Sequence, residues 1–541
     1  MSTTTANYSL VKPAPTDRVD VAVLNGDFDA IDAALGVNGL DITSLGVTPE
    51  AEDMSAAVSA AMTTAVSRNK ALLLPLGLIN IAGDVQIPSG LRMVGCGPGS
   101  GFKVMAGSVN EYPLRNGSVG IHDVHLADFE IDGNKSNQSG DPSVNGTPNV
   151  LMALLSSTEM PGSNIILERL YGHDSIRLGF VLSNIRGGAI RDCRVENNGR
   201  DGISLFDACQ RIVIRGNRVL GCNDDHIALD GQNAQISDIV VADNVLTGPG
   251  VRSLGKGIRV QAARNVTVTG NVMDSLSEEG IRVNDWAALP VENISITGNT
   301  IASSSGRGIL VWAGSALYPG GRSTYAHISD VVIADNALSS TGLNAIELRT
   351  DHADNELMRV KVRGNIITAA GGDGVVTTTA GSAAVCDVDI DGNTVYGGVG
   401  HGVFCNLAKR ARVCGNTTYN NGTGGTNTTG VRVITNDLVV CTGNVAYETR
   451  SGGSRTQTIG IYIYGQGTAT AVLWKDNLAY NMNTGYSAGA IPGLASTDAV
   501  FNHTPGVRQP VTGSREGNVA LASLMTALDL YGVVINNTTA E

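Results

Sequence analysis

The sequence predicts an all-β fold, a right-handed parallel β-helix of about a dozen coils with short helical segments at its N-terminal and C-terminal ends. Three observations predict it: a recurring Gly-Asn or Asp-Asn phrase, short apolar strands between its copies, and an unusual composition. Gly supplies 68 of the 541 residues, whereas Phe, Trp and Tyr together make up only 4%. Hydrophobic residues still make up 42%, enough for a packed core and too many for a disordered chain.

The recurring phrase sets the length of one coil. It consists of two apolar residues separated by one position, then Gly or Asp, Asn, and another apolar residue. From Asn217 to Asn477, successive asparagines are separated by 27, 27, 28, 37, 29, 28, 23, 28 and 33 residues. Stacked at ~4.8 Å, identical amides can hydrogen-bond along the stack. We also expect Asn to adopt the left-handed backbone that the turn demands.

A second phrase lies between successive asparagines: a turn residue, Gly, Ile or Val, any residue, and an apolar residue. Because side chains alternate between faces, the first and third residues after the Ile face outward. Long polar side chains beside an aromatic ring suit a carbohydrate groove, and an insertion at residues 312–327 would project beside it. The alternative is an ordinary solvated face. The candidate substrate-binding residues are Asp230, Arg259, Arg282, Trp312, Glu347 and Arg349.

The turn column supplies the candidate catalytic residues Asp201, Asp225 and Glu279. Residues in one column lie ~4.8 Å apart on adjacent coils and ~10 Å apart on alternate coils, near the carboxyl spacings of glycosidases. We expect Asp225 to be the acid, since neighbouring like charges would raise its pKa. In the competing interpretation Asp-Gly-Ile is only the ordinary turn of the repeat, as at Asp373. No His/Cys cluster has the spacing of a metal site, so we expect no metal and no cofactor, with calcium left open.

The ends of the chain differ from the repeat. The spacing of apolar residues predicts helices over residues 24–35, from Thr48-Pro49 to Val66, and within 517–532. The second helix would cover the open end of the first coil, whose first strand is Leu72–Pro75. The predicted segments are an attachment segment (1–45), a cap with the first strands (46–100), the β-helix (101–485) and a C-terminal segment (486–541).

Charge and cysteine content restrict the partners. A net charge of −13 argues against nucleic acid, and no apolar stretch reaches the ~18 residues of a membrane-inserted helix. The eight cysteines contain no C-x-x-C pair and fall mostly in apolar strands, which favours buried free thiols over disulfides or metal ligands.

Several motifs carry a resemblance to known families. Residues 48–485, which open with Leu72–Pro75 and Ile87–Gly99, resemble the pectate-lyase-like β-helix superfamily. Tyr8–Asp17 and Asp20–Asp32 look like the N-terminal segment of phage tail-fibre proteins, and Val511–Leu524 is similar to a C-terminal segment of phage fibres. The resemblance implies a phage tailspike or fibre on the virion, assembled in the host cytoplasm, with residues 1–45 bound to other virion proteins.

A shorter resemblance concerns the turn column. The stretch Asn223–Leu229, with Asp201 before it and Lys256 after it, is similar to the polygalacturonase pattern of one Asp, an Asp pair on the next coil and a later basic residue. The Gly-His-Gly element of that family is missing between the Asp pair and Lys256.

Three functions are consistent with these patterns. The chain is a phage tailspike that binds and depolymerises a bacterial surface polysaccharide, a fibre that only binds or decorates, or a cellular polysaccharide lyase or hydrolase. The fibre-like ends favour the first two. We expect a homotrimer, because Leu521, Leu524 and Leu528 form a stripe too narrow for a domain core.

Overall fold

The computed structural model describes residues 3–4, 11–12, 39–49, 52–108, 112–140, 150–248, 255–286, 289–314, 327–351, 356–379, 384–425, 428–435, 437–465, 472–488, 509–514 and 534–539. The chain divides into two compact units, unit 1 up to Thr300 and unit 2 from Ile301 onward. The helices expected at 24–35 and 517–532, and most of the 312–327 insertion, lie outside the described residues.

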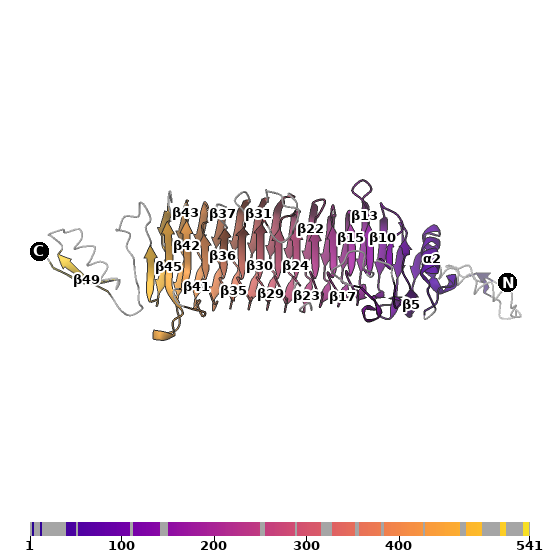
Figure 1. Cartoon of the computed structure of the whole chain (residues 1–541), viewed down its shortest axis with the longest axis horizontal. Coiled ribbons are helices and arrows are strands. Elements are labelled where there is room, and N and C mark those ends of the chain that lie inside the picture. Colours follow the sequence, from indigo (N-terminus) through magenta and orange to yellow (C-terminus); the bar gives the residue numbers. More distant parts are fainter. Residues whose placement is uncertain are drawn as a thin grey trace. The chain divides into compact units, whose positions relative to one another are not determined.

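Both units have the predicted fold, the right-handed parallel β-helix (Figure 1). A typical coil contributes one strand to each of three sheets, which we number 1 to 3, and each strand pairs in parallel with its equivalent on the neighbouring coil. All-β architecture follows because the repeat alternates short apolar strands with Gly, Asn and Asp turns.

The strands of unit 1 are as follows. Sheet 1 contains β3 (Gly39–Asp41), β4 (Ala71–Leu73), β7 (Arg92–Val94), β10 (His122–Ala127), β13 (Gly162–Glu168), β16 (Ile185–Arg191), β19 (Gln210–Arg215), β22 (Ile236–Ala242), β25 (Ala263–Thr269) and β28 (Val291–Thr297). Sheet 2 contains β5 (Gly77–Ile81), β8 (Ser100–Val104), β11 (Glu130–Asp132), β14 (Tyr171–His173), β17 (Arg194–Glu196), β20 (Arg218–Leu220), β23 (Val245–Thr247) and β26 (Val272–Asp274). Sheet 3 contains β6 (Val85–Ile87), β9 (Leu114–Asn116), β12 (Met152–Leu155), β15 (Phe180–Ser183), β18 (Ile203–Phe206), β21 (Ile227–Asp230), β24 (Ile258–Gln261) and β27 (Ile281–Asn284).

The strands of unit 2 repeat this order, and β29 (Thr300–Ala302), of sheet 2, contains the boundary between the units. Sheet 1 contains β31 (His327–Ala334), β34 (Glu356–Arg363), β37 (Ala384–Asp391), β40 (Ala411–Cys414), β43 (Val439–Thr442) and β46 (Val472–Lys475). Sheet 2 contains β32 (Ala337–Ser339), β35 (Ile366–Thr368), β38 (Thr394–Tyr396), β41 (Thr417–Tyr419), β44 (Val445–Tyr447) and β47 (Leu478–Tyr480). Sheet 3 contains β30 (Ile309–Ala313), β33 (Ile346–Thr350), β36 (Val375–Thr379), β39 (Val403–Asn406), β42 (Thr428–Thr435), β45 (Gln457–Gly465) and β48 (Thr484–Ala488).

The remaining elements are short. They are β1 (Thr3–Thr4) paired with β2 (Val11–Lys12), β49 (Gln509–Ser514) paired with β50 (Val534–Thr539), the 3-10 turns η1 (Ile42–Leu45), η2 (Lys135–Asn137) and η3 (Gly452–Ser454), and the helix α2 (Ser55–Ser67).

The asparagine column forms the predicted ladder of hydrogen bonds. In unit 1 the side-chain amide of Asn244 donates to Asn271 Oδ1 at 2.9 Å, and the amide of Asn271 donates to Asn299 Oδ1 at 2.9 Å. Unit 2 contains an equivalent ladder from Asn336 to Asn477. The backbone N–H of each Asn donates to the same oxygen, so buried polar groups of the corner are satisfied.

The left-handed backbone falls one residue before the position we expected. The ladder asparagines have ordinary φ, whereas the preceding residue is left-handed, as at Gly270 (φ 66°) and Asp243 (φ 55°). Gly and Asp tolerate that conformation, which leaves the Asn side chain free to point into the stack. The expectation holds only for Asn134, with φ 52°.

The helix α2 begins at Ser55, six residues after the predicted start at Pro49, because the Asp53 carboxylate accepts the Ser55 backbone N–H at 2.9 Å. The helix packs on β4 and β6 at the N-terminal end of unit 1 (Figure 1). Ser55 Oγ accepts the backbone N–H groups of Ala82 and Gly83, so α2 also satisfies donors at the first coil. These contacts place α2 against the first coil, the position that the predicted capping role requires.

The first coil begins before the boundary predicted at residue 45. Strand β3 (Gly39–Asp41) pairs in parallel with β4, the predicted first strand, and η1 follows β3 directly. Residues 39–45 of the expected attachment segment thus belong to the β-helix of unit 1.

The inner positions of each strand are apolar and fully buried, as Ile203 and Leu205 of β18 illustrate. Six of the eight cysteines are buried free thiols, as expected; Cys96 is exposed and Cys386 is half-buried. Among the described residues, none belongs to a helix that is long and apolar enough to cross a membrane.

Candidate functional site

The candidate site of unit 1 is built on the turns that precede β18, β21 and β24 in sheet 3. These strands pair in register, with Ser204 opposite Ala228 and Ala228 opposite Arg259. The residues of the predicted outward column are therefore in register within unit 1. The turns place Asp201, Asp224 and Asp225 so that one oxygen of each lies within 4.8 Å of the others, the short separation expected on adjacent coils.

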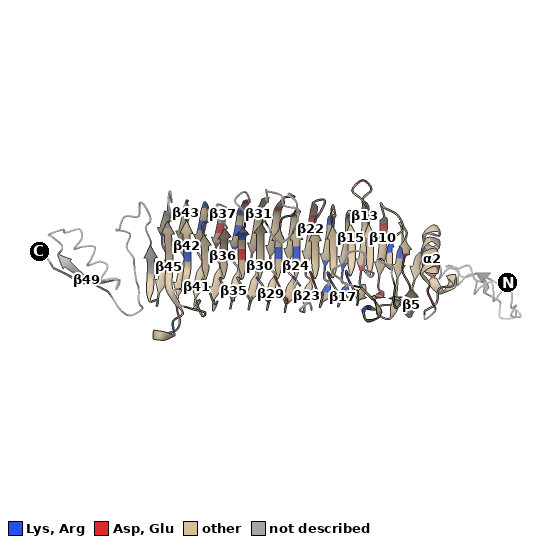
Figure 2. Ribbon diagram, in the orientation of Figure 1, with Lys and Arg blue, Asp and Glu red and all other residues tan. Residues whose placement is uncertain are grey.

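Two cations neutralise this cluster of carboxylates. Arg259 Nε lies 2.5 Å from Asp225 Oδ2, and Lys256 Nζ lies 3.5 Å from Asp225 Oδ1. Lys256 also approaches Asp224 at 3.9 Å and Glu278 at 2.8 Å, so it bridges three carboxylates on the two coils that flank its own. Figure 2 marks the basic residue of β24 in blue on sheet 3.

Burial and mutual repulsion separate the proton affinities of the three carboxyls. Burial, and then the charge of Asp225, raise the pKa of Asp201 to about 6. Burial, with the charges of Asp225 and Asp201, raises the pKa of Asp224 to about 7. Burial would also raise the pKa of Asp225, but Arg259, Lys256 and Arg282 outweigh it and lower that pKa below its ordinary value.

The expected direction for Asp225 is therefore wrong. We expected like charges to raise its pKa, but cations from the next two coils surround it and keep it ionised. The raised pKa values belong to Asp201 and Asp224. The side chain of Asp224 is 24% exposed against 1% for Asp225, so Asp224 is the group of this pair that meets solvent.

The other predicted residues of unit 1 lie beside this cluster and are buried rather than open. Asp230 accepts Arg259 Nη2 at 3.0 Å and the amide of Gln232 at 2.8 Å. Glu279 and Arg282 lie close together, with Glu279 Oε2 4.0 Å from Arg282 Nη1. These side chains form a buried ionic network, not a solvated face.

The predicted residues of unit 2 form separate contacts on sheet 3. Glu347 accepts Arg307 Nε at 2.7 Å and the Asn344 amide at 2.9 Å. Trp312 and Arg349 are register partners, and the guanidinium lies 4.7 Å from the centre of the indole ring.

Trp312 faces outward as predicted, but it is not an open stacking platform. Trp312 is only 7% exposed. Arg349 covers one face of the indole ring, and the indole Nε1–H donates to Asp351 Oδ2 at 2.9 Å.

A hollow of about 410 Å³ lies in unit 1 on the outer face of sheet 3. Its floor combines apolar side chains with two partly exposed rings, and its rim carries amide and carboxylate groups. Gln232, at the rim, donates to Asp230 of the ionic network, so the hollow adjoins the carboxylate cluster. Its lining includes Tyr112, Leu178, Val181, Phe206, Gln232 and Asn233.

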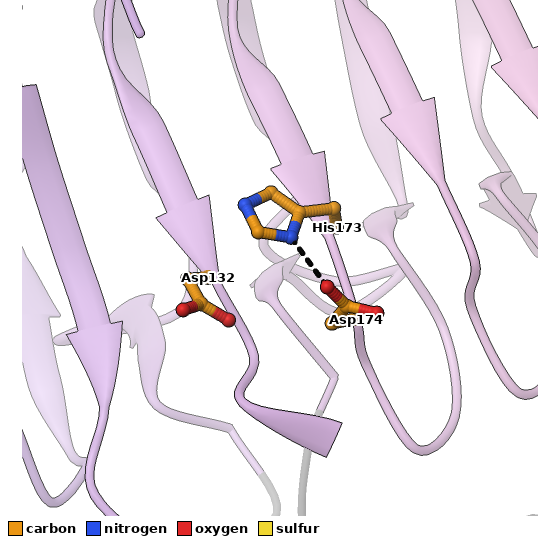
Figure 3. Close-up of side chains that lie close together, drawn as sticks. All are labelled: Asp132, His173 and Asp174. Carbon is orange, nitrogen blue, oxygen red and sulfur yellow. Dashed lines mark hydrogen bonds and ion pairs between the residues drawn. The ribbon is translucent and has the colours of Figure 1, made fainter. Parts of the chain in front are cut away.

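A second cluster with metal-ligand geometry lies on sheet 2 of unit 1. Asp132, His173 and Asp174 place one ligand atom each within 4.8 Å of the others (Figure 3). His173 Nδ1 lies 2.7 Å from Asp174 Oδ2, and Asp132 pairs with Lys103 at 2.8 Å. The atoms of this cluster that could bind a metal are thus already engaged in hydrogen bonds and an ion pair. In the carboxylate cluster, oxygen ligands would suit calcium, but Lys256 and Arg259 already supply the countercharge.

Comparison with known proteins supports the fold. A family model described as periplasmic copper-binding protein (NosD) matches residues 172–318. The search of curated proteins returned no match. The pre-mature gene product 12 of bacteriophage phi29 is similar at 13% identity and a TM-score of 0.52, over 86% of this chain and 75% of that one. The family 28 exopolygalacturonase of Yersinia enterocolitica is similar at 11% identity and a TM-score of 0.49, over 72% and 76%.

Sequence reasoning did not select Asp224, Lys256, Glu278 or the hollow. The Asp pair and Lys256 stood in the polygalacturonase-like pattern, so that resemblance was the available signal. Glu278 precedes the predicted Glu279 by one position, and the side chain of Glu278 is the more exposed of the two, 29% against 6%.

Proposed function

We propose that this chain is a phage virion protein that binds a bacterial surface polysaccharide and hydrolyses its glycosidic bonds. The observation that carries the proposal is the carboxylate cluster of unit 1, in which pKa values of about 6 and 7 lie beside an ionised Asp225. Glycosidases need one protonated and one ionised carboxyl at the same pH, and separated pKa values are how a site provides them.

Asp224 is the proposed general acid. Its raised pKa favours the protonated form towards neutral pH, and its partly exposed side chain can donate that proton to a glycosidic oxygen. Glu278 is the proposed ionised partner, since it lies 2.8 Å from Lys256 Nζ, the same atom that approaches Asp224. Glu278 would receive the proton of the attacking water, or attack the sugar carbon itself.

The candidates predicted from the sequence keep supporting roles in this proposal. Asp201 and Asp225 raise the pKa of Asp224 by repulsion, and Arg259 keeps Asp225 ionised. Asp230 holds Arg259 from its other side, while Arg282 pairs with Glu279. The hollow beside Phe206 would receive neighbouring sugar rings, with Gln232 and Asn233 at hydrogen-bonding distance from their hydroxyls.

The test is incubation of the full chain with purified envelope polysaccharide from the host. We expect shorter chains and new reducing ends without an unsaturated product. An unsaturated product would indicate a lyase. Binding without any shortening would instead support the alternative of a fibre that only recognises or decorates the surface.

We also propose that the protein is a homotrimer attached to other virion proteins by its N-terminal segment. The support is the resemblance of both ends to phage fibres and the apolar stripe Leu521–Leu528. Light scattering should give three times the 55.9 kDa of one chain, and a monomer mass would contradict the trimer.

A chain truncated to test the N-terminal segment should start before Gly39, since β3 pairs with β4. This truncated chain should fold and keep its glycan affinity.

A further inference from the structure

A second outer surface, in unit 2, combines an arginine with two aromatic rings and a histidine. Phe404 of β39, Arg432 of β42 and Tyr462 of β45 are register partners on successive coils of sheet 3. The guanidinium carbon of Arg432 lies 4.9 Å from the centre of the Phe404 ring and 5.5 Å from that of Tyr462. All three side chains are partly exposed, and Figure 2 shows the basic position of β42 in blue. The two rings therefore hold the cation at the surface.

Most of the other described arginines of this unit have a carboxylate partner that Arg432, like Arg363 and Arg455, does not have. Among the residues that the structure describes, no Asp or Glu forms an ion pair with Arg432, and its Nε is buried without a hydrogen-bond partner. Six other arginines of unit 2 each pair with a carboxylate: Arg307 with Glu347, Arg349 with Asp351, Arg359 with Asp330, Arg410 with Asp387, Arg412 with Asp389 and Arg450 with Glu448. The two rings and the His401 side chain that contact Arg432 carry no negative charge, so the cation keeps capacity for an anion.

His401 adds a second reason to expect an anion here. The backbone N–H of Thr429 donates to His401 Nδ1 at 2.9 Å, and Arg432 Nη1 lies 3.0 Å from His401 Nε2. Burial and the charge of Arg432 lower the pKa of His401 to about 4, so its ring is neutral near pH 7 and carries one N–H. With Nδ1 accepting, that N–H lies on Nε2 and faces another donor. One acceptor placed against Nε2 and Nη1 would satisfy both donors.

We infer that this surface binds an acidic saccharide, with a sugar carboxylate on Arg432 and His401. The carboxylate supplies the acceptor that both donors lack and matches the planar guanidinium. The rings of Phe404 and Tyr462, with Tyr464 36% exposed on the same face of β45, supply apolar surface for the sugar. Asp373 is a neighbour of this site: its Oδ1 accepts the His401 backbone N–H at 2.7 Å, and burial raises its pKa although the charge of Arg432 acts against that rise.

This site is separate in its residues from the proposed hydrolytic site and does not require cleavage. It would bind the acidic saccharide in a protein that has no hydrolase activity. Failure of one proposal therefore leaves the other standing.

The test measures binding of the full chain to tetrasaccharides of galacturonic, glucuronic and mannuronic acid. Each is compared with the same tetrasaccharide after its carboxyl groups have been reduced to alcohols, and dissociation constants are obtained by titration calorimetry. We expect the best acidic tetrasaccharide to bind about tenfold or more tightly than its reduced form, the scale of one charged hydrogen bond.

Two variants locate the effect. Arg432→Gln should abolish the preference for the acidic form, while Arg432→Lys, which keeps the charge but loses the planar fork, should retain part of it. Arg412→Gln is the matched control, since it removes one positive charge from a surface pair with Asp389 and should keep the full preference. Unchanged cooperative melting would confirm that each variant folds.

Three results would overturn the inference. They are equal affinity for the acidic and reduced forms, a preference for the acid that persists in Arg432→Gln, and absence of binding at millimolar tetrasaccharide. Binding of inorganic phosphate in place of the tetrasaccharides would likewise contradict a saccharide ligand.

Discussion

Two columns of buried polar side chains in unit 1 differ in how well they are satisfied. In the asparagine column, Asn271 donates to Asn299 and accepts both the backbone and side-chain N–H groups of Asn244. In the turn column, Asp201 Oδ1 is buried without a hydrogen bond, and three carboxyls crowd within 4.8 Å. The first arrangement stabilises the fold, whereas the second costs folding free energy. The comparison indicates that the asparagine column stabilises the fold, whereas the turn column is the candidate for chemistry.

The largest expected effect is on catalysis. Asp224→Asn removes the proposed acid without changing its shape, so cleavage should slow by about 10²–10⁴-fold, the usual contribution of general acid catalysis. The rate of reducing-end formation measures it, and polysaccharide affinity should stay nearly unchanged.

Asp387→Asn is the control for this substitution, because Asp387 belongs to an exposed pair with Arg410 in unit 2. It should cleave like the parent protein. Equal rates for Asp224→Asn and the parent would contradict a catalytic role of Asp224 and leave the turn column with a structural role.

The satisfied column should respond in stability instead. Asn271→Ala removes the donor to Val241 O and the acceptor of the Asn244 backbone and side-chain N–H groups, so we expect a loss of about 3 kcal/mol in the free energy of unfolding. Urea denaturation measures the loss. Gln86→Ala, at an exposed position of β6, should change the free energy by about 0.5 kcal/mol or less; a similar loss in both variants would contradict the importance of the ladder.

In the turn column, by contrast, replacing a carboxylate should raise the free energy of unfolding at high pH. The folded pKa of Asp201, about 6, exceeds its ordinary value of 3.8. Its contribution to stability is thus complete below about pH 3.8 and is lost as the pH rises through about 6. Asp201→Asn cannot ionise, so it should be more stable than the parent by about 1–2 kcal/mol at pH 8 and equal to it at pH 4. Urea midpoints at both pH values test this, and a destabilised variant at pH 8 would contradict it.

The smallest expected effect concerns where sugars bind. Phe206 lines the hollow and is partly exposed, so Phe206→Ala should weaken polysaccharide binding by about 1 kcal/mol or more. Trp312→Ala should mainly lower the melting temperature, since its ring is covered by Arg349 and bonded to Asp351. The reverse pattern in calorimetry would show that Trp312 is uncovered on binding.

The repeat made the fold and the register predictable, but not the surroundings of each side chain. Period-two alternation assigned Asp230, Arg259 and Trp312 to the outer face, and the strand pairing shows the register on which that assignment depends. Alternation does not reveal which neighbour covers an outward side chain, so the ionic network was missed.

The sequence pattern also could not predict the direction of a pKa shift. It depends on the balance between burial and charges on adjacent coils, and for Asp225 the cations prevail. The left-handed position was predicted wrongly for a related reason. The prediction assigned both the left-handed backbone and the side-chain hydrogen bonds to Asn271, whereas Gly270 has the left-handed backbone and Asn271 forms the hydrogen bonds.

The asparagine ladder also bears on the chemical ageing of the chain. Deamidation requires the backbone nitrogen of the next residue to attack the asparagine side-chain carbonyl. In the ladder that nitrogen is already engaged: Val272 N–H donates to Asn244 O at 2.9 Å, and Thr300 N–H donates to Asn271 O at 2.9 Å. The side-chain oxygen of Asn271 accepts two further hydrogen bonds. The residue that forms the ladder is therefore held in a geometry that slows its own deamidation, and spontaneous damage should appear first at exposed asparagines outside the ladder.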